Sequence, residues 1–270
     1  MNWLDLSGQV AVVTGAGAGI GRGIALALAE AGAAVAILDR DESGRGAAAD
    51  INKSGGSALF VACDVTDDAS VTQARRQIKE WQGQPSILVN NAGTMRNGAL
   101  ETMAMADWDA VLALNLTGYF RCARIFGAPM LARGQGSIVH IASISATAPQ
   151  SFSGAYSIAK AGVAMLSRQL AVEWGPRGVR SNVVSPGMIE TAMTEGIYAT
   201  PGVRETRERL VPSRRIGQPR DVANAVVFLA SARADYINGE EVIVDGGFTR
   251  TIMSQIPRPG FEASDTVRNQ

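Results

Sequence analysis

The sequence predicts an α/β fold, a doubly wound sheet of about seven parallel strands in a single domain. Short apolar runs rich in β-branched residues alternate with helix-like stretches along nearly the whole chain. These runs lack a polar alternation, as expected for strands buried on both faces of a parallel sheet. No linker or internal repeat interrupts the pattern. Residues 1–250 therefore form one domain, and residues 251–270 form a C-terminal tail that a partner subunit could hold.

The first strand, residues 10–13, runs into a glycine-rich turn at residues 14–21 and then into an Ala- and Leu-rich helix at 22–31. Glycine permits a tight turn and a close approach to a phosphate, and a helix N-terminus offers unpaired N–H groups. The spacing is Thr-Gly-x-x-x-Gly-x-Gly, which differs from the common Gly-x-Gly-x-x-Gly. We interpret the turn as the pyrophosphate site of a Rossmann-like fold, with a purely structural turn as the alternative.

The second strand, residues 34–38, ends in Asp39. An acidic residue about twenty positions after the glycine turn can accept hydrogen bonds from an adenosine ribose. Its charge would repel a 2′-phosphate, which favours NAD over NADP, although Arg22 and Arg40 could offset part of this repulsion. Capping of the next helix, residues 42–53, together with Asp41 is the alternative role.

Polar residues also follow the third and fourth strands. The third strand, residues 58–62, leads to Asp64, which is placed to face an adenine. After a helix at 69–81, the fourth strand, residues 87–89, is followed by Asn-Asn-Ala-Gly at 90–93. Small and amide residues in this position favour a second contact with a cofactor, and a simple loop is the alternative.

The second half of the chain carries the candidate catalytic groups. A helical stretch at 108–133 contains Asn115, which is a poor interior helix residue and therefore indicates either a buried polar role or a surface position. The fifth strand, residues 137–142, delivers Ser143. The helix at 153–174 holds Tyr156 and Lys160, which lie on one face at the i, i+4 spacing. A neighbouring ammonium favours a phenolate, so this pair could act as a base. Alone, the pair is more often a chance match.

The remaining segments complete the sheet. A sixth strand, residues 180–184, is followed by a polar segment at 188–217 that we expect to be irregular and to act as a substrate-determining lid. A helix at 221–230 and a seventh strand at 241–244 close the domain. The lone histidine, His140, lies in an apolar strand and is expected to be neutral and packed.

Composition narrows the function classes. Lys+Arg and Asp+Glu each total 25, which argues against nucleic-acid binding and a polybasic membrane anchor. Cys63 and Cys122 lack metal-type spacing, so we expect no metal site and interpret both as buried small hydrophobes. The N-terminus has no signal-peptide pattern and no run is long enough to span a membrane, so we expect a cytoplasmic protein with a small-molecule substrate.

Taken together, these motifs resemble the short-chain dehydrogenase/reductase family, of the classical type. The likeness runs from about residue 6 to residue 247, and its motifs are the Thr-Gly-x-x-x-Gly-x-Gly turn, Asp64-Val65, Asn-Asn-Ala-Gly at 90–93, Asn115, Ser143, the Tyr156–Lys160 pair, Pro186-Gly187 and Asp-Gly-Gly at 245–247. Two features fall outside the pattern: the tail after residue 247 is long, and the segment 188–217 has no recognisable signature.

The resemblance implies specific roles. Tyr156 would be the general acid/base, Lys160 would lower its pKa and hold the nicotinamide ribose, Ser143 would bind the reacting oxygen, and Asn115 would support a water-linked proton path. A homotetramer is also implied. The implied cofactor contacts are Gly15, Gly19, Ile20 and Gly21 at the pyrophosphate, Asp39 at the adenosine ribose, Asp64 and Val65 at the adenine, Asn91, Ala92 and Gly93 along the cofactor, Tyr156 and Lys160, and Pro186, Gly187, Ile189 and Thr191 near the carboxamide and phosphate.

The predicted activity is NAD-dependent hydride transfer between a secondary alcohol, such as a sugar, polyol or cyclic alcohol, and its ketone. Two alternatives remain at this stage. An NADPH-dependent 3-oxoacyl-thioester reductase would share nearly every motif, and Arg96 is compatible with it, whereas Asp39 weighs against it. A non-catalytic dinucleotide-binding protein is disfavoured because the set of catalytic residues is complete.

Overall fold

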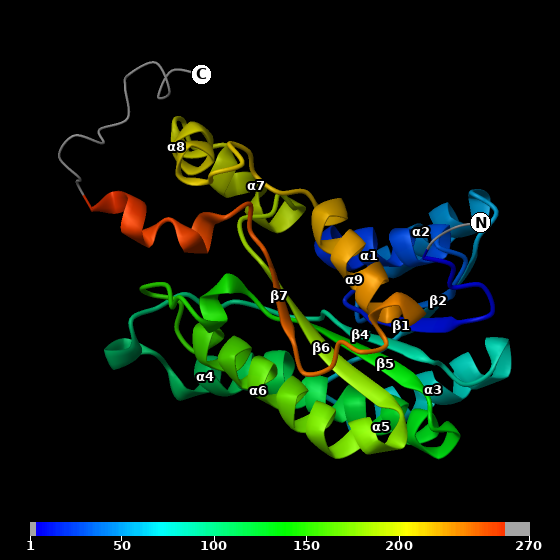
Figure 1. Cartoon of the computed structure of the whole chain (residues 1–270). Coiled ribbons are helices and arrows are strands. Elements are labelled where there is room, and N and C mark those ends of the chain that lie inside the picture. Colours follow the sequence, from blue (N-terminus) through cyan, green and yellow to red (C-terminus); the bar gives the residue numbers. More distant parts are fainter. Residues whose placement is uncertain (1–3, 257–270) are drawn as a thin grey trace.

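A seven-stranded sheet forms the centre of the protein (Figure 1). The computed structural model describes residues 4–256. All six strand pairings are parallel, and the order is β3-β2-β1-β4-β5-β6-β7. The chain reverses its winding direction between β1 and β4, which confirms the predicted doubly wound fold. The strands are β1 (Val10–Thr14), β2 (Ala34–Asp39), β3 (Ser57–Ala62), β4 (Ile87–Asn90), β5 (Gly136–Ile141), β6 (Val179–Pro186) and β7 (Glu241–Val244).

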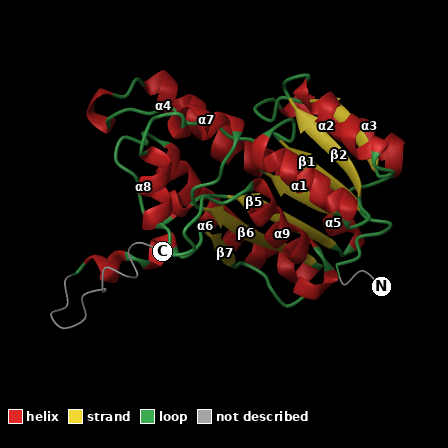
Figure 2. Ribbon diagram, turned by 90° about the horizontal axis from the view of Figure 1, so that it is seen from above, coloured by secondary structure: helices red, strands yellow, loops and turns green. Residues whose placement is uncertain are grey.

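Helices cover both faces of the sheet (Figure 2). One layer contains α1 (Gly19–Glu30), α2 (Ser43–Lys53) and α9 (Pro219–Ala230). The other contains α3 (Asp68–Gln82), α4 (Met105–Leu112), α5 (Gly118–Arg133) and α6 (Tyr156–Trp174). Crossover helices on both faces are what a parallel sheet requires, because each strand must return to the same edge before the next begins.

Alternation along each strand divides the core into two halves. Val13 packs with the layer of α1 and α9, whereas Val12, the preceding residue, packs with the layer of α3 and α5. Both side chains are fully buried. Successive side chains on a strand point to opposite faces, so a strand covered on both sides must be apolar at every position. This explains the continuous apolar runs in the sequence.

The predicted helix at 108–133 is longer and less regular than expected. Helical backbone runs from residue 105 to residue 133, but residues Ala113–Thr117 form a π-helical turn between α4 and α5. A π turn inserts one extra residue into a helix and is frequent at functional sites. It lies around Asn115, whose side chain is fully buried.

The segment 188–217 is not irregular, and this prediction was wrong. It contains two short helices, α7 (Ala192–Tyr198) and α8 (Val203–Leu210). The start of α7 is stabilised by a capping box in which the side chains of Thr191 and Thr194 bond to each other's backbone N–H groups. Helices of seven or eight residues span only two turns, so their periodicity is too brief to distinguish from a loop.

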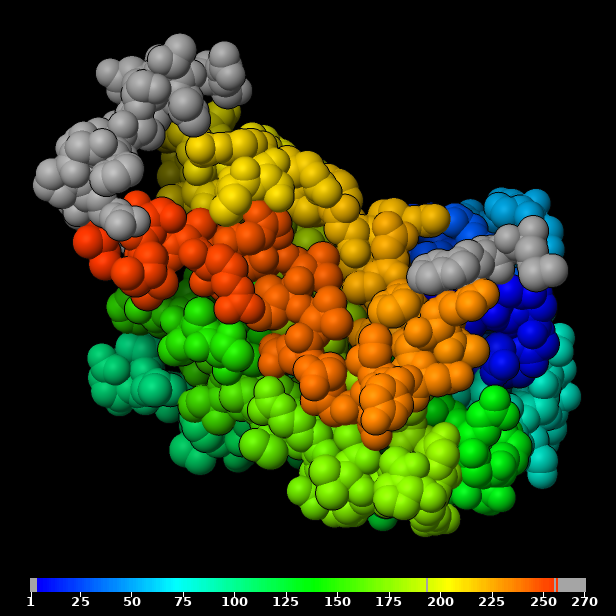
Figure 3. Space-filling model, viewed as in Figure 1, coloured from blue at the N-terminus to red at the C-terminus, as the bar shows by residue number. Residues whose placement is uncertain are grey.

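The α7–α8 segment lies against the last part of the described chain (Figure 3). The hydroxyl of Ser213 donates to the carbonyl oxygen of Gly246 at 3.0 Å, just after β7. Residues Ile252–Gln255 form a 3-10 turn, with the side chains of Ile252 and Met253 exposed. The tail predicted at 251–270 lies beyond the described residues from position 257 onward. No helix within residues 4–256 is long and apolar enough to cross a membrane.

Candidate active site

Residues that follow the strands gather at one edge of the sheet, because parallel strands all end on the same side. The glycine turn comes first, directly after β1. Gly15 and Gly19 have φ of +62° and +54°, in the left-handed region that side chains disfavour. A Cβ on Gly15 would lie 2.7 Å from the Cα of Ala92, which follows β4. The turn therefore packs closely against the end of β4, and the two segments predicted to contact a cofactor lie side by side.

A network around Thr14 holds these two turns together. The buried Thr14 hydroxyl oxygen accepts hydrogen bonds from the N–H groups of Asn91 at 2.9 Å and Ala92 at 3.1 Å. The Asn91 side-chain amide donates to the carbonyl oxygens of Thr14 and Gly15 at 3.0 and 2.9 Å. Asn91 was predicted to lie along a cofactor, and in the structure its amide N–H groups support the glycine turn.

The region fits a dinucleotide pyrophosphate. The first turn of α1 contains no acidic residue, and Ala18, at its N-cap, makes no side-chain cap. The N–H groups in the first turn of α1 are therefore available to an anion, and the positive end of the helix dipole favours a negative charge there. A Cβ on Gly19 would approach Thr191 Cγ2 at 3.4 Å, so Thr191 of the segment after β6 lies over this turn. The structure brings together Gly19 and Thr191, which the resemblance assigned to the cofactor.

Asp39 lies beneath the glycine turn. Its Oδ2 accepts from the N–H of Gly17 at 2.8 Å, and its Oδ1 accepts from the N–H of Asp41 at 3.1 Å. The N-cap of α2 is Glu42, so Asp39 orders the turn and does not cap that helix. Because each carboxylate oxygen can accept a second hydrogen bond, a ribose contact remains compatible with this geometry.

The neighbouring arginines differ in their pairing. Arg22 forms an ion pair with Asp50 of α2 at 2.6 Å, whereas Arg40 is exposed directly after Asp39.

Asp64 and Val65, the predicted adenine contacts, follow β3. The Asp64 carboxylate accepts hydrogen bonds from the N–H and the hydroxyl of Thr66, and the hydroxyl contact lowers the pKa of Asp64. Val65, the next residue, is buried.

Tyr156 begins α6, and Ser143 follows β5. Burial raises the pKa of Tyr156, and a hydrogen bond with the Ser143 hydroxyl opposes that rise. Ser143 Oγ also accepts from the N–H of Ser145 at 3.1 Å, which caps the 3-10 turn Ile144–Ala146. The predicted strand-tip hydroxyl and helical phenol therefore converge. They form a site that can bind an oxygen atom and exchange a proton with it.

Lys160 is more deeply buried than its partner, with 3% of its surface exposed. Its Nζ lies 5.8 Å from the centre of the Tyr156 ring. Its direct hydrogen bonds go to the hydroxyl of Tyr119 at 3.1 Å and to the carbonyl oxygen of Ile141 at 2.8 Å. Burial lowers the pKa of Lys160 to about 7, because the interior disfavours the charged amine.

Asn115 has a buried polar role, one of its two predicted alternatives. Its Oδ1 accepts from the N–H of Thr94 at 2.8 Å, and its Nδ2 donates to the carbonyl oxygen of Thr94 at 2.8 Å. A Cβ on Gly93 would lie 3.2 Å from this Oδ1. The π turn thus positions an amide that fixes the loop after β4.

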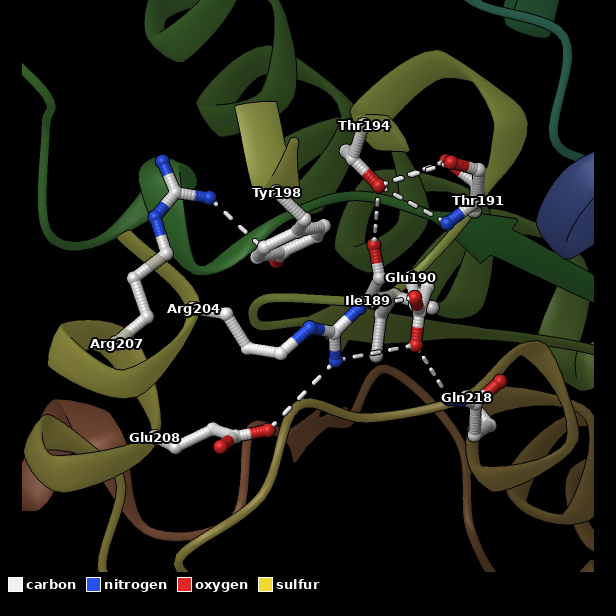
Figure 4. A network of polar contacts seen from close by, with 9 residues as sticks. All are labelled: Ile189, Glu190, Thr191, Thr194, Tyr198, Arg204, Arg207, Glu208 and Gln218. Carbon is white, nitrogen blue, oxygen red and sulfur yellow. Dashed lines mark hydrogen bonds and ion pairs between the residues drawn. The ribbon is translucent and has the colours of Figure 1, made fainter. Parts of the chain in front are cut away.

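The segment after β6 is fastened by a polar network (Figure 4). Gly187 donates to the carbonyl oxygen of Val244 at 2.9 Å, so Pro186-Gly187 is held by β7, and Ile189 is buried beside Gly217. Glu190 forms an ion pair with Arg204 of α8 and accepts from Gln218 Nε2 at 3.0 Å. The network ties α8 to the start of α9, next to Thr191. Its members are Ile189, Glu190, Thr191, Thr194, Tyr198, Arg204, Arg207, Glu208 and Gln218.

Comparison with known proteins identifies the family. The family model described as enoyl-(acyl carrier protein) reductase matches residues 15–249. The chain belongs to the short-chain dehydrogenase/reductase family, of the classical type. It is therefore an enzyme of the short-chain alcohol dehydrogenase and ketoreductase kind, with a dinucleotide-binding fold, as the sequence motifs predicted.

Relatives within the family act on several kinds of substrate. The chain is 42% identical to a D-threitol dehydrogenase of Mycolicibacterium smegmatis over 246 residues, which is 90% of this chain and 94% of the relative. It is also 42% identical to a galactitol 2-dehydrogenase (L-tagatose-forming) of Cereibacter sphaeroides over 248 residues, covering 90% and 96%. A 3-oxoacyl-[acyl-carrier-protein] reductase of Escherichia coli is 38% identical over 244 residues, covering 90% and 98%.

A solved structure from the family matches the whole fold. The gluconate 5-dehydrogenase of Burkholderia cenocepacia, in complex with NADP and tartrate, superimposes with a TM-score of 0.88 and 34% identity. The match covers 92% of this chain and 98% of that structure. A putative 2-deoxy-D-gluconate 3-dehydrogenase of Agrobacterium tumefaciens with bound NADP gives 0.86 at 36% identity, covering 93% and 100%.

The predictions for His140 and the two cysteines are confirmed. His140 is fully buried, and burial, followed by the charge of Lys160, lowers its pKa to about 3, so the ring is neutral. Cys63 and Cys122 are buried free thiols, and burial raises the pKa of both. They pack in the core between the sheet and the α3–α5 layer.

Two residues of the site had no sequence signal that pointed to their role. Thr14 belongs to the glycine-turn motif, but the sequence does not show that its hydroxyl joins the ends of β1 and β4. Tyr119 was not predicted to belong to the site, although its hydroxyl accepts a hydrogen bond from Lys160. Its only sequence signal was a tyrosine four residues after Asn115, on the same helical run, and such a position is usually part of the core.

Proposed function

We propose that the enzyme transfers a hydride between a secondary alcohol of a polyol or sugar and its ketone, with NAD as the preferred dinucleotide. The observation that carries this proposal is the convergence of Ser143 and Tyr156 at the sheet edge that also holds the glycine turn. The D-threitol and galactitol dehydrogenases among the relatives support the polyol class.

The residues of the chain act on the reacting oxygen and its proton. In the oxidation direction, the Tyr156 phenolate removes the proton from the substrate hydroxyl, and the Ser143 hydroxyl donates a hydrogen bond to the oxygen as its charge changes. The ammonium of Lys160 stabilises the phenolate form of Tyr156. The nicotinamide supplies the redox chemistry, because it accepts the hydride from the carbinol carbon.

The preference for NAD rests on Asp39. Its carboxylate is anchored by the N–H groups of Gly17 and Asp41, so it cannot easily move away from a 2′-phosphate. Repulsion between a fixed carboxylate and a phosphate would weaken NADP binding. Arg40 is the group that could offset this repulsion, and both solved relatives named above contain NADP.

The test of the NAD preference is to compare kcat/KM for NAD and NADP in the native enzyme and in Asp39→Ala. A native preference for NADP would refute the proposal.

A second candidate function is the NADPH-dependent reduction of 3-oxoacyl thioesters. It is favoured by the 3-oxoacyl-[acyl-carrier-protein] reductases among the relatives. An assay with acetoacetyl-CoA and NADPH, beside a panel of polyols and sugars with NAD, separates the two functions. The polyol proposal expects turnover of the panel and little or none of the thioester.

The assignment of Tyr156 is tested by Tyr156→Phe, which removes one oxygen atom and keeps the ring. We expect loss of turnover with dinucleotide affinity largely retained, because the phenol acts on the substrate proton. Tyr236→Phe is the matched control, since its ring is fully exposed. Retained activity in Tyr156→Phe would exclude the proposed base. A native protein that binds NAD tightly but turns over no alcohol would instead favour the non-catalytic alternative.

A further inference from the structure

The amine of Lys160 has two hydrogen-bond partners in the interior, and neither belongs to the catalytic residues named above. One is the Tyr119 hydroxyl on α5 at 3.1 Å, and the other is the carbonyl oxygen of Ile141 on β5 at 2.8 Å. A protonated lysine has three N–H donors. Two of them are therefore used within the protein, and one remains for the reaction.

Tyr119 is held in the orientation that this contact needs. Its hydroxyl donates to the same Ile141 carbonyl oxygen at 3.1 Å, so its lone pairs are free to accept from Lys160. The side chain is 1% exposed, and burial raises its pKa well above the usual value, so it remains a neutral phenol. Its ring stacks on His140 with centroids 6.0 Å apart, and it also lies 4.8 Å from Lys160 Nζ.

The Ile141 carbonyl is available because of the sheet register. The last pair between β4 and β5 joins Asn90 to His140, so Ile141 lies one residue beyond the end of β4. The next residue, Ala142, donates its N–H to the Val184 carbonyl of β6. Backbone groups of consecutive residues in a strand point to opposite sides. The Ile141 carbonyl therefore faces the side on which β4 has already ended. It accepts hydrogen bonds from the side chains of Tyr119 and Lys160 in place of a strand.

We propose that Tyr119 is a positioning residue that holds the Lys160 amine at a fixed point behind the catalytic tyrosine and stabilises its charged form. This inference deepens the proposed function and rests on it for its catalytic consequence. By accepting one N–H, Tyr119 compensates part of the hydration that the ammonium loses on burial. The remaining N–H is then kept for the site that contains Tyr156.

Three titratable groups from three elements face Lys160. Tyr119 comes from α5, Tyr156 from α6, and His140 from β5, whose pKa is lowered in part by the charge of Lys160. His140 is neutral near pH 7, and burial raises the pKa of both Tyr119 and Tyr156. Lys160, whose pKa burial lowers to about 7, is therefore the member of this set that titrates near neutral pH.

The test is a direct titration of Lys160 in the full-length protein. The chain contains three lysines, Lys53, Lys79 and Lys160. Only Lys160 is buried among them, so its signal in a protein labelled with ¹³Cε-lysine is the one that titrates near neutral pH. In Tyr119→Phe the ring is kept and the acceptor is lost. We expect the pKa of Lys160 to fall by about 0.5–1 unit below its native value.

Ser167→Ala is the matched control. Ser167 is on the same helix and is fully buried, and its hydroxyl is hydrogen bonded to Ser181 Oγ at 2.9 Å. This variant also removes one buried hydrogen bond of α6, but the partner of that hydroxyl is Ser181 and not Lys160. We expect it to lose thermal stability and to leave the titration of Lys160 unchanged. An equal shift in both variants would show a general loosening of α6 and would overturn the proposal.

Kinetics provide the second readout. With a smaller charged fraction of Lys160, the phenolate of Tyr156 is less stabilised. At an assay pH about two units above the pKa of Lys160, kcat for alcohol oxidation should fall by about three- to tenfold with KM for the alcohol little changed. An unchanged Lys160 titration in Tyr119→Phe refutes the positioning role, whatever the activity. Failure of the native enzyme to oxidise any alcohol refutes the proposed function, and the titration still decides the role of Tyr119.

Discussion

Replacing Gly21 with alanine tests whether the start of α1 is built for a close backbone approach. Gly21 lies in the first turn of that helix, and a Cβ placed there would be 2.2 Å from the Gly15 carbonyl oxygen and 2.5 Å from Asn91 Nδ2. Real Cβ atoms essentially never approach another atom within 3.0 Å, and here the nearest atom is backbone. The glycine turn, or the helix, must therefore move.

Two opposing effects set the size of the change. Alanine in place of glycine favours a helix by about 1 kcal/mol. Overpacking of a tight interior site costs about 1–3 kcal/mol, and a clash with backbone belongs at the upper end of that range. We expect Gly21→Ala to be destabilised by about 1–2 kcal/mol, or a melting temperature lower by about 2–8 °C. Displacement of the turn should also weaken dinucleotide affinity at least about tenfold.

Gly46→Ala is the control for the helix effect. Gly46 lies within α2, and a Cβ there would have no atom within 4 Å. This variant should be more stable than the native protein by about 0.5–1 kcal/mol and should bind the dinucleotide normally. The assays are thermal unfolding and calorimetric titration with NAD and NADP. If Gly21→Ala retains both stability and affinity, or if the two variants behave alike, the inferred close approach is wrong.

Three further predictions concern other parts of the protein. Burial lowers the pKa of His140 from 6.5 to about 3, so between these pH values the unfolded chain binds more protons than the folded protein, and the free energy of unfolding should fall as the pH drops from about 6.5 towards 3. His140→Phe should flatten the pH dependence of the urea midpoint, and an unchanged slope would contradict this. Glu190→Gln removes the charge opposite Arg204 and should speed hydrogen exchange in residues 192–210 about two- to tenfold, with the midpoint of global unfolding little changed. Unaltered exchange would exclude a fastening role for this ion pair. Exposed apolar side chains on α5 and α6, including Phe120 and Val172, support the proposed homotetramer. Light scattering should therefore give about four times the chain mass of 28.3 kDa, and a monomer mass would refute the proposal.

Much of the fold could be predicted from the sequence, because its signals are local. A strand buried on both faces must be apolar at consecutive positions, and a helix of eleven or more residues shows its period. The seven strands and the long helices therefore match the prediction, apart from shifts of a few residues at their ends. The helices α7 and α8 could not be recognised, since each spans about two turns and depends on Thr191, Thr194 and the ion pair of Arg204.

The chemistry of the site could also be predicted in kind. Ser143, Tyr156 and Lys160 stand at spacings that a strand tip and the following helix bring together, and the glycine turn marks the phosphate end. The buried amide of Asn115 was one of two alternatives, because a sequence does not show whether a helical asparagine faces solvent or a loop. The contact with Thr94 that decides this point joins residues 21 positions apart.

The sequence by itself determined the fold class and the family and was enough to propose a catalytic set, since these depend on residue type and short spacing. Only the tertiary structure decided which groups bond to that set. Tyr119 and Ile141 reach Lys160 because α5, α6 and the end of β5 meet where β4 has stopped. Gly19 meets Thr191 because the segment after β6 folds back over the start of α1. Such contacts join positions that are distant in the chain, and their distances are set by packing, which no local pattern records.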